Sequence, residues 1–295
     1  MQGHELCFAF QTRYNIGGES RRGCKVYARD GVSNEPGEQA MLMEVRGKTL
    51  SVEKQGRGDA VILLHGLGST ANVWEPQVRT LADRFTVLRF DLEGMGRSPL
   101  AGALSIDGWV QDLKALLDLH KIARARLVGH SLGTLILQHF AVAHPHYVDR
   151  LVLIGVNRAP PEARRVAIRE RVAKIRSEGL DAIVDTVVAG GVSPHTLATK
   201  PEVVAFVREL LTRQPVEGYA RSCEAMAAAV AADVSAIRAP VLLLAGRDDA
   251  VSPVANSEAL AADLVDARLQ VIEQCGHWHP IEQPGRVAAA LQDFL

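Results

Sequence analysis

Leu127-Val128-Gly129-His130-Ser131-Leu132-Gly133 is the stretch that decides the fold of this chain. An apolar run, residues 125–128, leads into it, and a helical run, residues 135–143, follows. A turn this tight from strand to helix leaves no room for side chains two positions before and after its centre, so glycine occupies both. Ser131 is thereby pushed onto a strained point with its hydroxyl above the sheet. We predict that Ser131 is a catalytic nucleophile.

A serine nucleophile needs a base, because its hydroxyl is unreactive near neutral pH without one within hydrogen-bond reach. In folds with this turn, the partners follow the serine in the order acid, then histidine. Only His277 and His279 lie beyond the last apolar run, residues 269–272. His277 directly follows Gly276, which lets the loop turn sharply back. We therefore predict His277 as the general base and His279 as a loop or lid-facing residue.

The acid should follow the preceding apolar run, residues 241–244, where Asp248 and Asp249 stand side by side. One carboxylate would fix the imidazole tautomer and stabilise its cation. The spacing from Gly246 and to Pro253 favours Asp249, and Asp248 is interpreted as a solvated loop charge.

An anion-stabilising site is expected after the run of residues 60–64, at His65-Gly66-Leu67-Gly68. One donor is the backbone amide of the residue after the nucleophile, Leu132, and we assign the second to the amide of Leu67. Loss of one such donor costs about 3 kcal/mol of transition-state stabilisation.

The same loop offers a rival interpretation as a dinucleotide-binding fingerprint. Gly66-Leu67-Gly68-Ser69-Thr70-Ala71 matches G-x-G-x-x-G/A after a strand, and Asp91 ends the next one. That would make the protein a nicotinamide- or flavin-dependent oxidoreductase. A hairpin precedes this strand, however, and the fingerprint leaves the serine turn and the terminal histidine loop unexplained. We interpret residues 91–98 as a supporting turn at the edge of the pocket.

The wider chain predicts an α/β fold with a mostly parallel, doubly wound sheet. Residues 41–46 and 49–54 alternate as a hairpin, and short apolar runs follow at residues 60–64, 85–90, 125–128, 151–154, 241–244 and 269–272. Continuous apolarity fits strands covered on both faces, and helical patterns separate them, one around Val110 and one around Leu264 and Val265. Trp74 and Trp109 are expected in the core.

The strand–helix alternation stops once, so we divide the chain into three parts. Residues 41–157 and 237–295 form the core, and the helix-rich residues 158–236 form a cap, or lid, over the carboxyl ends of the strands. Residues 1–40 lack periodicity and are expected to be a disordered or loosely attached extension.

Composition excludes several classes of function. The net charge is −1 with no block of one sign, so neither nucleic acid nor a membrane surface is an expected partner. Four scattered cysteines without a C-x-x-C pair argue against disulfides and a metal site. No secretory signal is expected at the start, and polar residues interrupt the longest apolar stretch. We expect a cytoplasmic protein that uses no metal or cofactor; the oligomeric state stays open.

With these residues in order, the chain resembles the α/β-hydrolase superfamily over nearly all of residues 41–295. In that family the last loop has a Glu five residues after the His, then Pro, which Glu282 and Pro284 match. Within it, the chain is similar to 3-oxoadipate enol-lactonases, in residues 217–225, 74–77 and 282–284. Two stretches differ. The lactonases usually carry Arg-Trp-Phe-Thr where this chain has Val188-Ala189-Gly190-Gly191. At the turn of the nucleophile they tend to have Ser-Met-Gly-Gly, where this chain has Ser131-Leu132-Gly133-Thr134.

The resemblance implies hydrolysis of a small carboxylic ester or lactone through an acyl-enzyme, with an enol-lactone as the best single candidate. Two alternatives are a carbon–carbon bond hydrolase on the same scaffold and a non-catalytic ligand receptor. For an anionic substrate, Arg158, Arg164, Arg213 and Arg221 are available, although nearby acids nearly cancel their charge. Recognition of an anion would therefore depend on one or two placed arginines.

Overall fold

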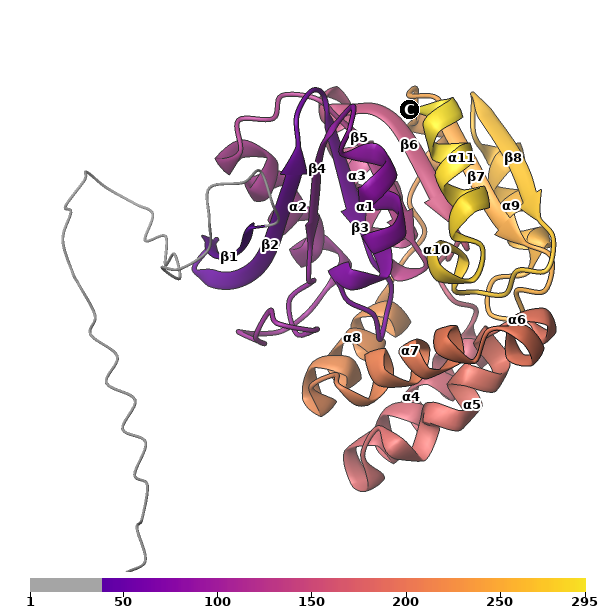
Figure 1. The fold of residues 1–295 in the computed structure, drawn as a ribbon. Helices are drawn as coiled ribbons and strands as arrows, with labels where there is room; N and C mark the ends of the chain where they lie inside the picture. Colours follow the sequence, from indigo (N-terminus) through magenta and orange to yellow (C-terminus); the bar gives the residue numbers. More distant parts are fainter. Residues whose placement is uncertain (1–38) are drawn as a thin grey trace, which may run out of the picture.

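Eight strands form one sheet in the computed structural model, which describes residues 39–295 (Figure 1). The spatial order is β1-β2-β4-β3-β5-β6-β7-β8. β2 pairs antiparallel with both β1 and β4, and every later pairing is parallel. The strands are β1 (Gln39–Val45), β2 (Lys48–Gly56), β3 (Ala60–Leu64), β4 (Thr86–Phe90), β5 (Ala125–His130), β6 (Val148–Ile154), β7 (Val241–Gly246) and β8 (Ala267–Ile272). The predicted α/β architecture is confirmed.

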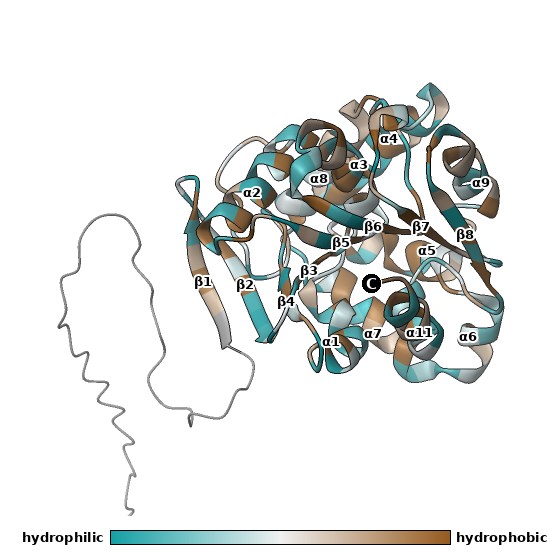
Figure 2. Cartoon of the chain, turned by 90° about the horizontal axis from the view of Figure 1, so that it is seen from above, coloured by the Kyte–Doolittle hydropathy of each residue, from teal (hydrophilic) through white to brown (hydrophobic). Residues whose placement is uncertain are grey.

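Helices cover both faces of this sheet. α1 and α11 lie on one face and α2, α3 and α9 on the other, as the two perpendicular views show (Figures 1 and 2). The helices outside the cap are η1 (Ala71–Trp74), α1 (Glu75–Leu81), α2 (Ile106–Leu119), α3 (Leu132–Ala143), η2 (Pro145–Tyr147), η3 (Val234–Ala236), α9 (Val254–Asp263), α10 (His279–Glu282) and α11 (Pro284–Phe294). Trp74 and Trp109 are buried, as expected.

The predicted hairpin is β1 and β2, in which Val45 pairs with Lys48 across a two-residue turn. The predicted extension, residues 1–40, lies outside the described residues except for Gln39 and Ala40. These two residues belong to β1 and pair with Lys54 and Glu53. The described chain therefore joins the sheet slightly before the boundary expected from the sequence.

The expectation that the apolar runs are covered on both faces is right for the central strands and wrong for β8. Every residue of β7 is buried, whereas β8 alternates between exposed and half-buried positions until Ile272. Figure 2 shows the contrast, with hydrophobic colouring along β6 and β7 and hydrophilic colouring along part of β8. β8 lies at one edge of the sheet and has a single neighbouring strand, β7, so it is less covered than the central strands. The helical face expected at Leu264 and Val265 is also wrong, because α9 ends at Asp263 and Val265 is exposed.

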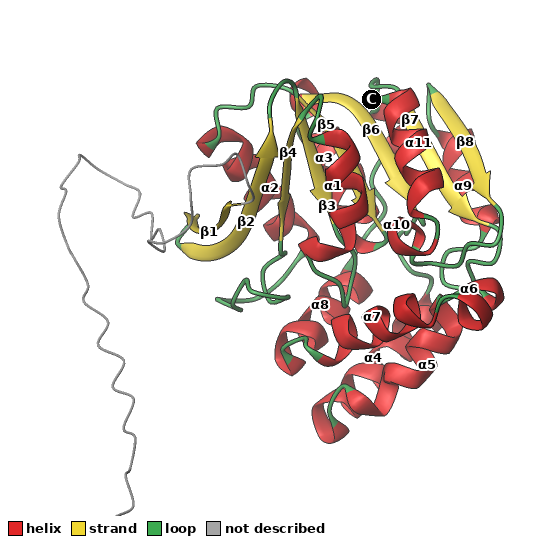
Figure 3. Cartoon of the chain, in the orientation of Figure 1, coloured by secondary structure: helices red, strands yellow, loops and turns green. Residues whose placement is uncertain are grey.

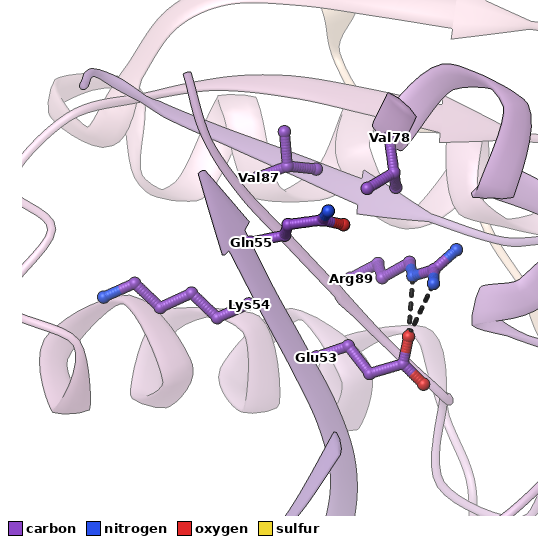
Figure 4. Close-up of a pocket in the computed structure, with 6 residues that line it drawn as sticks. All are labelled: Glu53, Lys54, Gln55, Val78, Val87 and Arg89. Atoms are coloured by element: carbon purple, nitrogen blue, oxygen red, sulfur yellow. Dashed lines mark hydrogen bonds and ion pairs between the residues drawn. The ribbon is translucent and has the colours of Figure 1, made fainter. Parts of the chain in front are cut away.

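The run at residues 85–90 is also less apolar than its pattern indicated, because it contains Arg89, the residue before the last of β4. Arg89 is buried, and its guanidinium meets the Glu53 carboxylate of β2 at 2.7 Å and Glu75 at 2.8 Å. Figure 4 shows this pair beside Val78 and Val87 in a small hollow. A buried charge is tolerated when an opposite charge and hydrogen bonds compensate its lost hydration. The cross-strand ion pair therefore explains how an arginine fits a buried strand.

Five α-helices lie between β6 and β7 and pack together beside the carboxyl ends of the strands (Figure 3). They are α4 (Glu162–Glu178), α5 (Asp181–Gly191), α6 (Pro194–Thr199), α7 (Pro201–Thr212) and α8 (Val216–Ala228). We call these helices the cap. α4 packs mainly against α8, and α5 against α7. The cap thus covers the edge of the sheet at which β5 delivers Ser131.

Candidate active site

Ser131 occupies the sharp turn between β5 and α3. Its backbone has φ 52° and ψ −116°, a strained conformation for a residue with a side chain. A Cβ atom on Gly129 would come within 2.8 Å of the Gly133 backbone, and one on Gly133 within 2.7 Å of the Leu64 carbonyl oxygen. Both positions therefore require glycine, as the motif predicted. The strain is held by a hydrogen bond from the Ser131 amide to the Ile154 carbonyl, 2.9 Å long.

The predicted nucleophile, base and acid form one hydrogen-bonded chain. His277 Nε2 lies 2.8 Å from Ser131 Oγ, and His277 Nδ1 lies 2.9 Å from Asp249 Oδ2. This geometry fits a Ser131 hydroxyl that donates to Nε2 and an Nδ1–H that donates to the carboxylate. The three residues are almost fully buried. The loops after β5, β7 and β8 thus bring together side chains that are up to 146 residues apart in sequence.

Asp249 is held ionised by its surroundings. Burial by itself would raise the pKa of this carboxyl group. The charge and hydrogen bond of His277, the charge of His279 and the amide of Ser252 outweigh burial and lower the pKa of Asp249 to about 2. Its second oxygen accepts hydrogen bonds from the amides of Val251 and Ser252, at 2.9 and 2.7 Å. Asp248 is exposed, which fits its interpretation as a solvated loop charge.

Glu282 holds the loop that carries the base. This carboxylate is fully buried and accepts hydrogen bonds from three backbone amides: those of Gly276 (3.1 Å), Trp278 (2.9 Å) and Ser193 (2.8 Å). The His277 amide in turn donates to the Gly191 carbonyl, 2.7 Å away. Gly191 and Ser193 belong to the end of α5 and the turn after it. Glu282 therefore joins the base loop to the cap.

Two further histidines contact the backbone of His277. His130 Nε2 and His279 Nδ1 both donate to the His277 carbonyl oxygen, at 2.6 and 2.8 Å. Both rings are buried, and burial is the main cause that lowers the pKa of each. His279 begins α10 and is fully buried against the base loop. His279 therefore supports the base backbone, and the expectation of a loop or lid-facing residue does not describe its place.

The loop after β3 lies directly against the nucleophile. A Cβ atom on Gly66 would approach the Ser131 Cβ to 2.7 Å. Within the described chain, the amides of Leu67 and Leu132 donate no internal hydrogen bond, as expected of donors kept for a ligand. His65 anchors the loop: its Nδ1–H donates to the Gly66 carbonyl and its Nε2 accepts from the Leu92 amide. The loop that carries Leu67 thus lies against the nucleophile, and the role of the two amides as oxyanion donors stays a prediction.

Asn157 is a contact of the nucleophile that sequence reasoning missed. Its side-chain Nδ2 donates to Ser131 Oγ across 3.0 Å. Its own backbone is fixed twice, because its amide donates to Thr134 Oγ1 and its carbonyl accepts from Gln138 Nε2. Asn157 follows β6, the neighbour of β5 in the sheet. A polar residue just after an adjacent parallel strand is the signal that could have identified it.

The turn after β4 is held in place by Asp91, whose carboxylate binds backbone amides of the protein. One oxygen of Asp91 accepts from the Ala71 amide and the other from the Arg97 amide, at 2.7 and 2.8 Å. A fingerprint carboxylate must instead be free to bind the ribose. The segment after β3 also begins with the short 3₁₀ helix η1 (Ala71–Trp74). The geometry therefore gives the dinucleotide interpretation no support.

Residues 39–295 were also searched for cavities, metal-binding clusters and membrane-spanning helices. A cavity of about 330 Å³ opens between α7 and the η1–α1 segment, and none of the five predicted site residues lines it. No group of three metal-ligating side chains converges within this range. Among the same residues, every helix is too short or too polar to cross a membrane.

Comparison with known proteins agrees with this geometry. The profile of a hydrolase family, described as serine aminopeptidase S33, matches residues 56–284. The chain belongs to this family and has the α/β-hydrolase fold. It is 32% identical to 3-oxoadipate enol-lactonase 2 of Acinetobacter baylyi over 227 residues, which cover 76% of this chain and 84% of the relative. The predicted enzyme class, a hydrolase that acts on ester bonds, is confirmed.

Two solved structures share the fold closely. A thermophilic esterase from Thermogutta terrifontis, studied with malate bound, superposes with a TM-score of 0.81 at 28% identity and covers 87% of this chain and 97% of its own. An enol-lactonase from Burkholderia xenovorans LB400 has a TM-score of 0.80 at 29% identity, with coverage of 85% and 97%. The likeness therefore extends over the core and the cap together.

Proposed function

We propose that this protein hydrolyses a small carboxylic ester or lactone through an acyl-enzyme on Ser131. The observation that carries the proposal is the hydrogen-bonded chain from Ser131 through His277 to Asp249, set at a strained turn. The esterase and enol-lactonase relatives support the class of substrate. An enol-lactone is the best single candidate, because an enol is a better leaving group than an alkoxide.

The mechanism begins when Ser131 Oγ attacks the carbonyl carbon and its proton passes to His277 Nε2. The tetrahedral oxyanion rests on the amides of Leu67 and Leu132. His277 then protonates the leaving oxygen, which leaves the acyl group on Ser131. In the second half, His277 removes a proton from water as the water oxygen attacks the acyl carbonyl. The bond between the acyl carbon and Ser131 Oγ then breaks, His277 returns the proton to Oγ, and the acid is released. Asp249 holds the Nδ1–H tautomer and stabilises the imidazolium in both halves.

The first test is whether the reaction depends on Ser131. We expect Ser131→Ala to lower kcat by about a thousandfold or more while the fold stays intact, because only the attacking oxygen is lost. An organophosphonate probe should label the wild type at Ser131 and leave the variant unlabelled. Labelling of another residue would contradict the assignment.

The second test decides the class of substrate. We expect an enol-lactone carboxylate to have a higher kcat/KM than short neutral p-nitrophenyl esters. If the neutral esters are better by tenfold or more, the protein is a general carboxylesterase and the enol-lactonase proposal is wrong.

The proposed location is the cytoplasm. Cys223 and Cys275 are free and buried in the structure, although neither is part of the site. Burial raises the pKa of Cys223 to about 12 and also raises that of Cys275, so both thiols are kept protonated. Unpaired, unreactive thiols fit a reducing compartment.

A further inference from the structure

Gln214 lies in the short turn between α7 and α8 of the cap and is almost fully buried. Its side-chain amide has partners in two loops of the core. Nε2 donates to the Ser69 carbonyl in the loop after β3, across 3.2 Å, and Oε1 accepts from the Gly96 amide in the turn after β4, also at 3.2 Å. Nε2 also donates to the Leu210 carbonyl of α7, 2.9 Å away. One side chain thus ties both core loops to the cap.

These partners fix the orientation of the Gln214 amide group. The two carbonyl groups need a donor and the Gly96 amide needs an acceptor, so the arrangement uses both ends of a glutamine side chain. A glutamate of the same length would lose the donor, and a methionine would lose both groups. Because a buried carbonyl or amide without a partner is costly, this position requires glutamine.

Ser69, which accepts from Gln214, closes the turn in which Leu67 lies. The Ser69 amide donates to the Gly66 carbonyl at 3.3 Å, so the residues between them form one compact turn. The Gly66 end of this turn lies against Ser131, and the Ser69 end is held by Gln214. Among the described residues, the Leu67 amide has no internal acceptor. The shape of the turn therefore sets the direction of this N–H group.

The cap also packs directly on this turn. A Cβ atom on Gly68 would come within 2.6 Å of Leu211 Cδ2 and within 2.9 Å of Tyr219 Cε2. Leu211 of α7 and Tyr219 of α8 are both almost fully buried. The turn is therefore enclosed between the nucleophile on one side and two cap helices on another, with Gln214 as its hydrogen-bonded contact to the cap.

We propose that Gln214 is a positioning residue for the turn of residues 66–69, which we call the oxyanion loop. The proposal rests on the hydrolase function proposed above and on the predicted role of the Leu67 amide. A backbone amide stabilises an oxyanion best when it is aligned in advance, and a hydrogen bond weakens steeply when its angle is poor. The cap therefore contributes to the chemical step, by a hydrogen bond that keeps the loop in place.

The first test replaces Gln214 with methionine, which has a similar length but no amide. We expect Gln214→Met to lower kcat for p-nitrophenyl acetate by about tenfold while KM stays within about twofold, because the loop stabilises the oxyanion and not the bound ester. Gln214→Glu keeps the acceptor for the Gly96 amide but loses the donor to Ser69. It should lower kcat by a similar factor.

A thionoester distinguishes loss of the oxyanion interaction from general damage to the protein. The thionoacetate of p-nitrophenol has sulfur in place of the carbonyl oxygen, and sulfur accepts hydrogen bonds weakly. The ratio of kcat/KM for the acetate to that for the thionoacetate therefore reports the alignment of the loop amides. We expect Gln214→Met to lower this ratio by about threefold or more. A ratio equal to that of the wild type would overturn the proposal, even if both rates fall.

Gln77→Met is the matched control. Gln77 is also buried, and its Nε2 donates to the carbonyls of Pro280 and Pro284, at 3.0 and 3.4 Å, which lie outside the oxyanion loop. This variant should lower Tm by a similar amount but keep the wild-type ratio for the two esters. A control that lowers the ratio as much as Gln214→Met would refute the proposal.

Hydrogen exchange tests the loop without turnover and separates this proposal from the hydrolase function. In Gln214→Met the Ser69 amide should exchange about tenfold faster than in the wild type, because its bond to Gly66 opens more often, and Gln77→Met should not change it. If the wild type cleaves no ester but this exchange is faster in Gln214→Met, the hydrolase proposal fails and the hold of Gln214 on the loop is upheld. Unchanged exchange would contradict the positioning role whether or not the protein is active.

Discussion

The base loop of the core and helix α4 of the cap both carry charged side chains, but the surroundings of those charges differ. In the core, Asp249 and Glu282 are buried and accept hydrogen bonds from backbone amides and His277. In the cap, Arg164 and Arg171 are accessible and lack a carboxylate. The core charges are thus satisfied within the protein, whereas these two cap charges remain in contact with solvent.

The strongest test of this contrast is the adjacent pair of aspartates after β7. Asp249→Asn should lower kcat by about a thousandfold, because the amide no longer fixes the Nδ1–H tautomer of His277. Asp248→Asn is the matched control, since Asp248 is exposed on the same loop, and it should keep nearly full activity. Equal losses in the two variants would show that the acid has been misassigned.

Asp249→Asn should also change how the free energy of unfolding depends on pH. The pKa of Asp249 falls from 3.8 to about 2 in the folded protein, so the folded state favours the ionised carboxylate. The stabilisation is complete above about pH 4 and is lost as the pH falls through about 2. Denaturant unfolding should therefore show a steeper loss of stability in this range for the wild type than for Asp249→Asn.

A variant of Glu282 tests the contact between the base loop and the cap. Glu282→Gln keeps the shape but replaces one acceptor oxygen with a donor, so at least one of the three buried amides loses its partner. We expect the free energy of unfolding to fall by about 1–3 kcal/mol, with a decrease in kcat of about tenfold as the base loop loosens. Glu273→Gln, an identical change at an exposed residue of a nearby loop, should leave both quantities unchanged. A stable, fully active Glu282→Gln protein would mean that the loop is held by other contacts.

The parts that the sequence predicted well are those with a local pattern. The turn at Ser131 needs glycines at fixed spacing, and buried strands such as β7 need continuous apolar residues, so both are visible in a single stretch. The triad follows because the order of strands fixes which loops meet at the carboxyl edge.

The parts that were missed depend on contacts between distant segments. Burial of Arg89 depends on Glu53 in another strand, and the exposure of β8 depends on its place at the edge. The same holds in the cap. Arg171 could not be distinguished from Arg176 by sequence, because only the packing of α4 on α8 decides which arginine meets a carboxylate.

Asn157 gives the smallest expected effect and the sharpest test of how far the core is organised before a substrate binds. The side-chain Nδ2 of Asn157 donates to Ser131 Oγ, and the hydroxyl proton of Ser131 is thereby left to point at His277. A neutral hydrogen bond of this kind contributes about 1 kcal/mol, so Asn157→Ala should lower kcat/KM about fivefold. The loss should be similar for neutral and anionic esters, because Asn157 contacts the nucleophile. Asn256→Ala on α9 is the control and should change neither rate. A loss confined to the anionic ester would instead place Asn157 in substrate recognition, and the hydrogen bond to Ser131 would then not be its main contribution.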